Sequence, residues 1–248
     1  MPEETLLFCL PHAGGSAGFY LPLAEHLPPW LRLVPVELPG RGRRSIEPPC
    51  GDFEQLAEDV AARIRGGLER SGQPRYALFG HSLGAMLAFY EARKLKAHPP
   101  FHVFLSSPPI FHPRGTEQGE ETRCCHNLPR EKFLVMLREM GGLTDEVLNS
   151  PALIEYAEPV IRADFAALET WFPPVWPPLD LPFTLFSGEA ENRPLSHWAA
   201  RTTGTFASYR FPGGHFYLTA HWEKLAALMV RACGTLHQGA AAVARMRN

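Results

Sequence analysis

The sequence lacks any uninterrupted apolar stretch approaching the ~18 residues that a membrane-spanning helix requires. Its first residues, Met1–Glu4, also lack the basic start of a secretory signal. Neither sign of charge dominates, because the formal net charge is −2 and the isoelectric point is near 6.6. Such a balance gives no reason to expect nucleic acid or a membrane as a partner. We therefore expect a cytoplasmic protein.

Cysteines are few and scattered. An odd number in a chain too long to need disulfide staples favours free thiols. Cys124, Cys125 and His126 are adjacent, but a tetrahedral zinc site needs a second pair of ligands at suitable spacing, and none is evident. We therefore expect no bound metal. The cysteines are Cys9, Cys50, Cys124, Cys125 and Cys233.

The sequence has no internal repeat and no low-complexity linker, and its 248 residues suit one domain spanning 1–248. Short apolar runs bounded by glycine and proline alternate with helical patterns. Asp52 is placed to cap one helix, with Gln55 completing a capping box. This alternation predicts an α/β fold with a mostly parallel sheet and helices on both faces. The predicted strands are 6–10, 33–38, 76–79, 102–105, 183–187 and 209–211, and the predicted helices include 53–68, 82–97 and 221–232.

One long segment interrupts the alternation. Helical patterns at Glu131–Met140 and Leu153–Thr170 occur there without a clear strand. One helix can serve as the crossover that a parallel sheet needs, but residues remain to spare. Proline pairs bracket the segment, as suits hinges beside a mobile cap. We predict a helical lid inserted at residues 109–172.

The most informative motif is Gly80-His81-Ser82-Leu83-Gly84, between an apolar run and a helical pattern. Strand, tight turn and helix around a serine predict a nucleophile elbow, in which the glycines permit close backbone packing. An acidic segment and then Gly213-Gly214-His215 follow later in the chain. Nucleophile, acid and histidine in that order are typical of an α/β-hydrolase, so the chain is predicted to be a hydrolase or an acyltransferase.

Ser82 requires a base and an acid, because a serine hydroxyl is a weak nucleophile by itself. His215 is the predicted base, since it directly follows the last strand. Glu191 is the predicted acid, just beyond the strand at 183–187, and Glu189 is its close competitor. His12 and His81 lie near the same site, and we expect them only to support it.

Two backbone amides are expected to form an oxyanion hole. One belongs to Leu83, directly after the nucleophile, and the other to Ala13 in the glycine-containing loop after the first strand. A phosphate-binding role for this loop is disfavoured, because Gly14-Gly15 is not followed by Lys-Ser/Thr and does not form a G-x-G-x-x-G pattern.

Five motifs in register resemble those of the type II thioesterases, the discrete thioesterases of polyketide and nonribosomal peptide pathways, and those of the medium-chain thioesterase of animal fatty acid synthase. The resemblance spans nearly the whole chain. The motifs are Leu10-Pro11-His12-Ala13-Gly14-Gly15-Ser16, Glu37-Leu38-Pro39-Gly40-Arg41-Gly42, Gly80-His81-Ser82-Leu83-Gly84, Arg162-Ala163-Asp164-Phe165 and Phe211-Pro212-Gly213-Gly214-His215-Phe216.

The resemblance assigns roles residue by residue. It implies that Ser82 is the nucleophile, that His215 is the base, and that the Ala13 and Leu83 amides form the oxyanion hole. Residues 162–165 match the end of the helical lid, which in this family covers the acyl site and the phosphopantetheine entrance. The family usually has a Gly-Asp-x-Asp-like segment where this chain has glutamate at both acidic positions. Glu191 falls on the usual catalytic aspartate, but the register of this segment stays open.

The function implied is hydrolysis of acyl thioesters on the phosphopantetheine arm of acyl or peptidyl carrier proteins, through an acyl-serine intermediate. The cofactor then belongs to the partner, and the enzyme has no metal, nucleotide or flavin of its own. Editing of stalled acyl groups is the usual task in the family, and release of medium-chain acyl groups is a variant. A monomer is the default expectation.

Two other classes of function stay open. A general carboxylesterase or lipase would use the same triad without a protein partner. A catalytically silent binding protein would have lost the nucleophile or base, and the sequence retains both. An acyl channel is one interpretation of the apolar lid residues, although ordinary core packing is the commoner role of such residues. The channel candidates are Phe133, Leu134, Met136, Leu137, Trp171 and Phe172.

Overall fold

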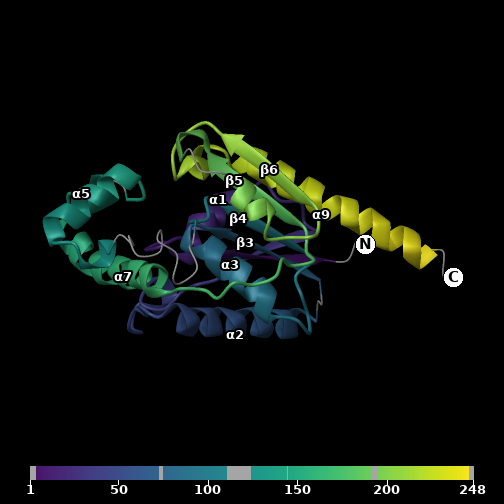
Figure 1. The fold of residues 1–248 in the computed structure, drawn as a ribbon, viewed down its shortest axis with the longest axis horizontal. Helices are drawn as coiled ribbons and strands as arrows, with labels where there is room; N and C mark the ends of the chain where they lie inside the picture. The colour runs from purple at the N-terminus through teal and green to yellow at the C-terminus, as the bar shows by residue number, and fades with distance from the viewer. Residues whose placement is uncertain (1–3, 73–74, 111–123, 144, 192–194, 246–248) are drawn as a thin grey trace.

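A computed structural model describes residues 4–72, 75–110, 124–143, 145–191 and 195–245. Its centre is a sheet with strand order β2-β1-β3-β4-β5-β6, in which every neighbouring pair is parallel (Figure 1). The predicted α/β fold with a parallel sheet is confirmed. The strands are β1 Thr5–Leu10, β2 Leu31–Pro35, β3 Tyr76–His81, β4 His102–Ser106, β5 Phe183–Gly188 and β6 Phe206–Phe211.

Helices cover both faces of this sheet and extend beyond one end of it (Figure 1). The α-helices are α1 Leu21–Ala24, α2 Phe53–Ser71, α3 Leu83–Lys94, α5 Arg130–Met140, α6 Asp145–Leu148, α7 Pro151–Thr170, α8 Ser196–Ala199 and α9 Trp222–Arg245. Short 3-10 helices are η1 Ala17–Tyr20, η2 Gly42–Arg44, η3 Cys125–Asn127, η4 Glu189–Glu191 and η5 Tyr217–Ala220.

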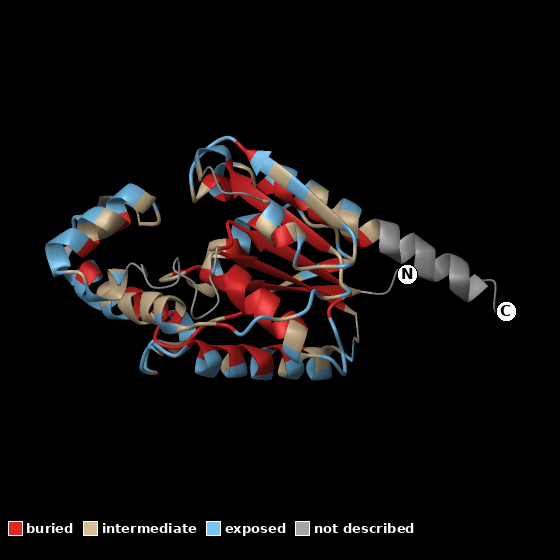
Figure 2. Ribbon diagram, viewed as in Figure 1, coloured by how far each residue is buried: buried red, intermediate tan, exposed pale blue. Residues whose placement is uncertain are grey.

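The two faces of the sheet have separate apolar cores, because successive side chains of a strand point to opposite sides. Leu6 and Phe8 of β1 pack into the core that contains α2 and α3. Leu7 and Cys9 pack into the other core, which contains residues of α1 and α9. All residues of β1, β3, β4 and β5 are buried, as expected for central parallel strands (Figure 2).

Local signals explain where most elements begin and end. The side chain of Asp52 accepts a hydrogen bond of 2.9 Å from the Gln55 amide and so caps α2. The return bond of a capping box is not found among the described residues, and Gln55 Oε1 lies 3.8 Å from Cys50 Sγ instead. Helix α3 ends at Lys94, earlier than predicted, since Leu95 leaves the helical region with ψ 48°.

Two strands differ from their predicted ranges. β2 ends at Pro35 rather than at Leu38, and the missing N–H of proline weakens the ladder there. β6 begins at Phe206, three residues before its prediction, because it pairs with β5 from Phe183 onward. It is an edge strand with several partly exposed side chains, so its apolar pattern is weak.

Residues 107–182 connect β4 to the neighbouring strand β5 and include α5, α6 and α7. These helices lie at one end of the molecule, beyond the sheet, and their surfaces are more exposed than the central core (Figure 2). Phe133 and Leu137 of α5 share a small apolar cluster with Ile161 of α7. The lid predicted at 109–172 remains a proposal, and its residues 111–123 and 144 lie outside the described residues. Within the described part of the chain, no helix is long and apolar enough to cross a membrane.

Candidate active site

Ser82 lies at a sharp bend between β3 and α3. Its φ of 54° and ψ of −114° are unfavourable for a residue with a side chain. The neighbouring glycines explain how the bend packs. A Cβ atom added at Gly80 would overlap the carbonyl of Gly84, and one added at Gly84 would overlap the carbonyl of Leu10. The local geometry is therefore the strand, turn and helix that the motif predicts.

His215 follows β6 and pairs with Glu191. Its Nδ1 lies 2.8 Å from Glu191 Oε1, and the two side chains are only 12% and 5% exposed. The other carboxylate oxygen accepts hydrogen bonds from the Ser107 hydroxyl and, at 3.1 Å, from the Gly188 amide. Glu189 is exposed. With Nδ1 donating to this carboxylate, Nε2 of the neutral imidazole is an acceptor.

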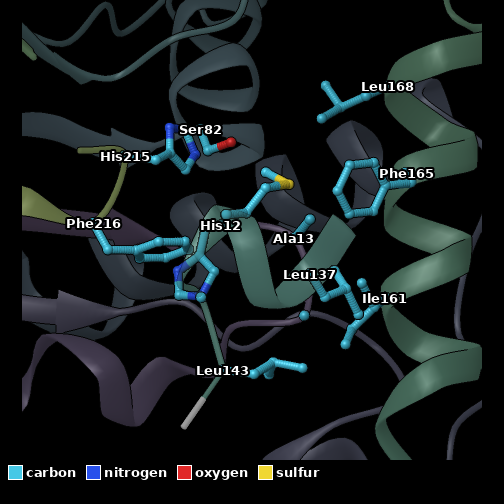
Figure 3. Close-up of a pocket in the computed structure, with 13 residues that line it drawn as sticks. His12, Ala13, Ser82, Leu137, Leu143, Ile161, Phe165, Leu168, His215 and Phe216 are labelled. Carbon is cyan, nitrogen blue, oxygen red and sulfur yellow. The ribbon is translucent and has the colours of Figure 1, made fainter. Parts of the chain in front are cut away.

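Ser82 and His215 line one pocket and lie next to each other in it (Figure 3). No hydrogen bond joins them among the residues that the structure describes. Catalytic hydrogen bonds of this kind are often long before substrate binds and tighten in the complex. The arrangement places a hydroxyl and an imidazole held by a carboxylate in the wall of a mostly apolar cavity.

The loop Pro11–Ser16 forms a tight turn beside Ser82. The Gly15 amide donates to the His12 carbonyl at 2.9 Å, and Gly14 has a φ of 75°, as the third position of a type II turn requires. The Ala13 amide, between these residues, has no hydrogen-bond acceptor within the described chain, and the Leu83 amide at the start of α3 has none either. Unpaired amides and a helix N-terminus suit a developing negative charge.

The two histidines predicted to support the site have different environments. Burial, followed by the charges of His215 and Arg41, lowers the pKa of His12 to about 3, so its ring is neutral. That ring packs edge-on against Phe19 and Phe216, with centroids 4.5 and 4.8 Å away.

His81 is fully buried, and its Nδ1 lies 2.9 Å from the Ser106 hydroxyl. The same hydroxyl lies 2.7 Å from the Tyr217 hydroxyl. The ring centroids of His81 and His215 are 4.8 Å apart. A buried hydrogen-bonded chain thus lies directly beneath the His215 imidazole, as expected of supporting residues.

The remainder of the pocket is apolar and is formed mostly by α5, α7 and the segment between α5 and α6. Figure 3 shows α7 side chains facing Ser82 across the cavity. The apolar lining residues are Leu137, Met140, Leu143, Ile161, Phe165, Leu168 and Phe216, with Ala13, Gly14 and Gly142. Such a lining suits a hydrocarbon chain.

Of the six residues for which the sequence left an acyl channel and core packing open, only Leu137 lines this pocket. Phe133 is fully buried in the apolar cluster shared by α5 and α7, and Leu134 and Met136 pack against this cluster. Trp171 stacks on Phe53 at a centroid distance of 3.8 Å, in the core between α2 and α3. Phe172 is not among the lining residues. Core packing is the better interpretation for Phe133, Leu134, Met136 and Trp171.

Sequence reasoning missed Ser107 and the pair Arg41–Asp164. Ser107 directly follows the buried strand β4, which is a signal that could have found it. Asp164 lies on the buried face of α7 beside Ile161 and is fully buried itself. A carboxylate at an apolar helical position indicates a buried partner, but the sequence does not say which.

The Cys124-Cys125-His126 segment gives no sign of a metal centre. Nδ1 of His126 lies 2.6 Å from Glu169 Oε2, and the Cys125 amide donates to the same carboxylate at 2.9 Å. Across the described residues, no group of three or more His, Cys, Asp or Glu side chains could hold a metal ion.

Comparison with known proteins gives concordant results. Residues 5–233 match a family model described as a thioesterase domain. The chain is 33% identical over 226 residues to thioesterase PikA5 of Streptomyces venezuelae, covering 88% of this chain and 77% of that protein. It is 30% identical over 224 residues to the human medium-chain S-acyl fatty acid synthase thioesterase, covering 88% and 82%. The solved structure of BorB, a type II thioesterase from the borrelidin biosynthetic cluster, matches with a TM-score of 0.76 at 31% identity, covering 93% and 92%.

Proposed function

We propose, because this chain belongs to the thioesterase family, that Ser82, His215 and Glu191 form its catalytic triad and that its substrates are acyl groups on carrier proteins. The enzyme is a hydrolase of thioesters and a type II thioesterase of the kind found in polyketide and nonribosomal peptide pathways.

One observation carries the proposal of a triad. The His215 imidazole, held by Glu191 at 2.8 Å, opens into the same pocket as Ser82. Two amides without acceptors among the described residues, those of Ala13 and Leu83, flank the serine. These are the base, orienting acid, nucleophile and oxyanion donors that acyl transfer requires.

In the first half of the reaction, Ser82 Oγ attacks the thioester carbonyl carbon while His215 Nε2 takes the hydroxyl proton. The carbonyl oxygen becomes an oxyanion and accepts hydrogen bonds from the Ala13 and Leu83 amides. Collapse breaks the carbon–sulfur bond. His215 gives its proton to the departing sulfur, so that the phosphopantetheine arm leaves as a free thiol, and the acyl group remains on the serine.

In the second half, a water molecule attacks the acyl-serine ester. His215 removes a proton from that water, and the same two amides stabilise the second oxyanion. Collapse releases a carboxylic acid and reprotonates Ser82. Glu191 keeps the imidazole in the tautomer with a free Nε2 and stabilises the imidazolium formed in each half.

The chemistry needs no group beyond these side chains, the two backbone amides and water. Phosphopantetheine enters as part of the substrate, attached to the carrier protein. We propose that editing of stalled acyl groups is the task, that the enzyme acts in the cytoplasm beside its carrier, and that it works as a monomer. The free state of all five cysteines agrees with a reducing compartment.

Release of medium-chain acyl groups is a second candidate, and it is favoured by the identity with the human medium-chain thioesterase. A general carboxylesterase would use the same residues without a carrier. The apolar pocket lining fits all of these activities, so a comparison of substrates is needed to distinguish them.

The test measures kcat/KM for one acyl group presented on a carrier protein, on pantetheine and as an oxygen ester. We expect the carrier-bound thioester to be preferred. Equal or faster ester hydrolysis would indicate a general esterase. A chain-length series on the carrier then separates editing, which favours short groups, from medium-chain release. Ser82→Ala is the control, and thioester hydrolysis at the wild-type rate by this variant would refute the triad.

A further inference from the structure

The ion pair between Arg41 and Asp164 lies outside the triad and joins the helix α7 to the rest of the molecule. It is fully enclosed, since the two side chains are 4% and 0% exposed. Arg41 Nη1 lies 2.5 Å from Asp164 Oδ2, and Nη2 lies 2.8 Å from Oδ1. A buried pair is weak evidence for stability, because desolvation offsets much of the attraction. Its other hydrogen bonds therefore indicate its role.

Two of those other bonds are made to the Pro11–Ser16 loop, beside Ser82. Asp164 Oδ2 also accepts the Gly14 amide at 2.7 Å. Arg41 Nη1 also donates to the Gly15 carbonyl at 3.3 Å, and its other nitrogens donate to the Pro39 carbonyl at 3.2 Å. Both charged groups thus contact the Pro11–Ser16 loop.

Helix α7 also packs directly on this loop. A Cβ atom added at Gly14 would meet Ile161 Cγ1 at 2.5 Å. Ile161 and Asp164 lie on the same buried face of α7, one turn apart. The helix therefore holds the loop both by an apolar contact and by a charged hydrogen bond.

These contacts orient one amide. The Ala13 N–H and the His12 C=O belong to one planar trans peptide and point in opposite directions. The Gly15 amide holds that carbonyl at 2.9 Å, and Asp164 holds the amide of Gly14 in the next peptide. Because the carbonyl of its own peptide and the amide of the following peptide are both bonded, the orientation of the Ala13 N–H is fixed, and this N–H has no acceptor among the described residues.

We propose that Arg41 and Asp164 are positioning residues that orient the Ala13 amide toward the oxyanion, so that α7 must be docked on the loop for the oxyanion hole to be complete. The inference rests on the proposed function, since it needs Ala13 to be an oxyanion donor. Asp164 comes from the inserted segment and Arg41 from the loop after β2, so the oxyanion hole depends on three separate parts of the chain.

The decisive variant is the double substitution Arg41→Met with Asp164→Leu. It removes both charges at once, whereas either single change to an apolar residue would leave a buried charge unpaired. We expect the double variant to fold, because replacement of a buried pair by apolar side chains is often tolerated. Its kcat should fall by about 10- to 100-fold, part of the loss seen when an oxyanion donor is deleted. Its KM should change by less than about threefold, because the donor acts on the transition state.

A transition-state analogue provides a readout that a merely structural role would not move. A trifluoromethyl ketone analogue of the acyl group adds to Ser82 and places an oxyanion in the hole. Its inhibition constant should rise by the same factor as kcat/KM falls. The acid limb of the pH–rate profile should stay in place, because neither substitution touches the His215–Glu191 pair.

The matched control is Asp59→Asn. Asp59 pairs with Arg44, three residues after Arg41, and among the described residues neither side chain of that pair forms a hydrogen bond with the Pro11–Ser16 loop. This control should keep the wild-type kcat and inhibitor affinity. Arg41→Lys is a milder second probe, since lysine keeps the charge but cannot form the planar bidentate pair. We expect a loss of about 3- to 10-fold in kcat with a matching loss of inhibitor affinity.

A folded double variant with kcat and inhibitor affinity within about twofold of wild type would overturn the inference. If that variant does not fold, wild-type values for Arg41→Lys would overturn it equally. A wild-type enzyme without thioesterase activity would instead refute the proposed function, so the two failures are distinguishable.

Discussion

Glu191 and His215 are joined by a hydrogen bond of 2.8 Å between Oε1 and Nδ1, whereas Glu189, two residues earlier, is exposed to solvent. The difference arises from η4, the single 3-10 turn Glu189–Glu191 that follows β5. This turn directs the later carboxylate back toward the strand end, where the Gly188 amide binds it at 3.1 Å. A glutamate can thus occupy the position of the usual aspartate, and we propose it as the acid of the triad.

Glu191→Gln should lower kcat by a factor on the order of 10³ or more. The amide nitrogen can donate to Nδ1, which would place the imidazole proton on Nε2 and prevent it from accepting the serine proton. Glu189→Gln is the matched control and should keep activity within about twofold, as is usual for exposed side chains. The measurement is steady-state hydrolysis of a carrier-bound thioester, and the opposite ranking of the two variants would assign the acid to Glu189.

Ser107→Ala should lower kcat/KM by about tenfold, equivalent to ~1.4 kcal/mol. The hydroxyl donates to Glu191, and its loss leaves that buried carboxylate with one donor fewer. The backbone is held at φ 44° in either case, so the substitution tests the hydroxyl. Ser187→Ala is the control, because the buried Ser187 hydroxyl on β5 has no hydrogen-bond partner among the described residues. Equal activity of both variants would show that Ser107 does not support Glu191.

Phe165→Ala should shift the acyl-chain preference toward longer groups. The ring lies on α7 and lines the pocket opposite Ser82 (Figure 3), so truncation lengthens the cavity. We expect the ratio of kcat/KM for a C8 over a C2 acyl group to rise by about tenfold, which is ~1.4 kcal/mol, or about two further buried methylenes at ~0.8 kcal/mol each. Tyr156→Ala, an exposed aromatic residue on the same helix, is the control and should leave the ratio unchanged. An unchanged ratio for Phe165→Ala would place the chain-length limit elsewhere.

His102→Gln should reduce the loss of stability in acid. Burial lowers the pKa of His102 from 6.5 to about 4. Between these values the unfolded chain binds a proton that the folded protein does not, so the free energy of unfolding falls as the pH falls from 6.5 toward 4. This histidine accounts for about 1–2 kcal/mol of loss between pH 7.5 and 5. Glutamine can keep the bond to Thr184, which lies 2.8 Å from Nε2.

The measurement is urea unfolding of wild type and variant at the two pH values. His26→Gln, an exposed histidine, is the control and should show the wild-type pH dependence. The buried His12 also has a lowered pKa, of about 3, and therefore also makes the protein less stable in acid. Its contribution is the same in wild type and in both variants, so it does not affect the comparison. If His102→Gln loses as much unfolding free energy between the two pH values as wild type, His102 is not the cause of that loss.

The sequence predicted the order and type of the central elements because their signals are local. Asp52 caps the N-terminus of α2, as its position in the sequence predicts. The observed ends of β1, β3, β4 and β5 lie within two residues of the ends predicted from their apolar runs. Edges were harder to predict. β2 and β6 border the sheet and bury less of their side chains, so their ends depend on which residues of the neighbouring strand they meet.

By itself, the sequence determined the nucleophile elbow, because a strand, a glycine, a serine and a helix within a few residues leave little choice of conformation. It also limited the acid to Glu191 or Glu189. Only the tertiary structure decided which of these carboxylates reaches His215 and which side chains of α5 and α7 line the pocket with Ser82. Arg41 and Asp164, separated by 123 residues, illustrate the reason. A contact between distant segments depends on how helices pack on a sheet, and a local pattern of residues does not show which distant side chain will be the partner.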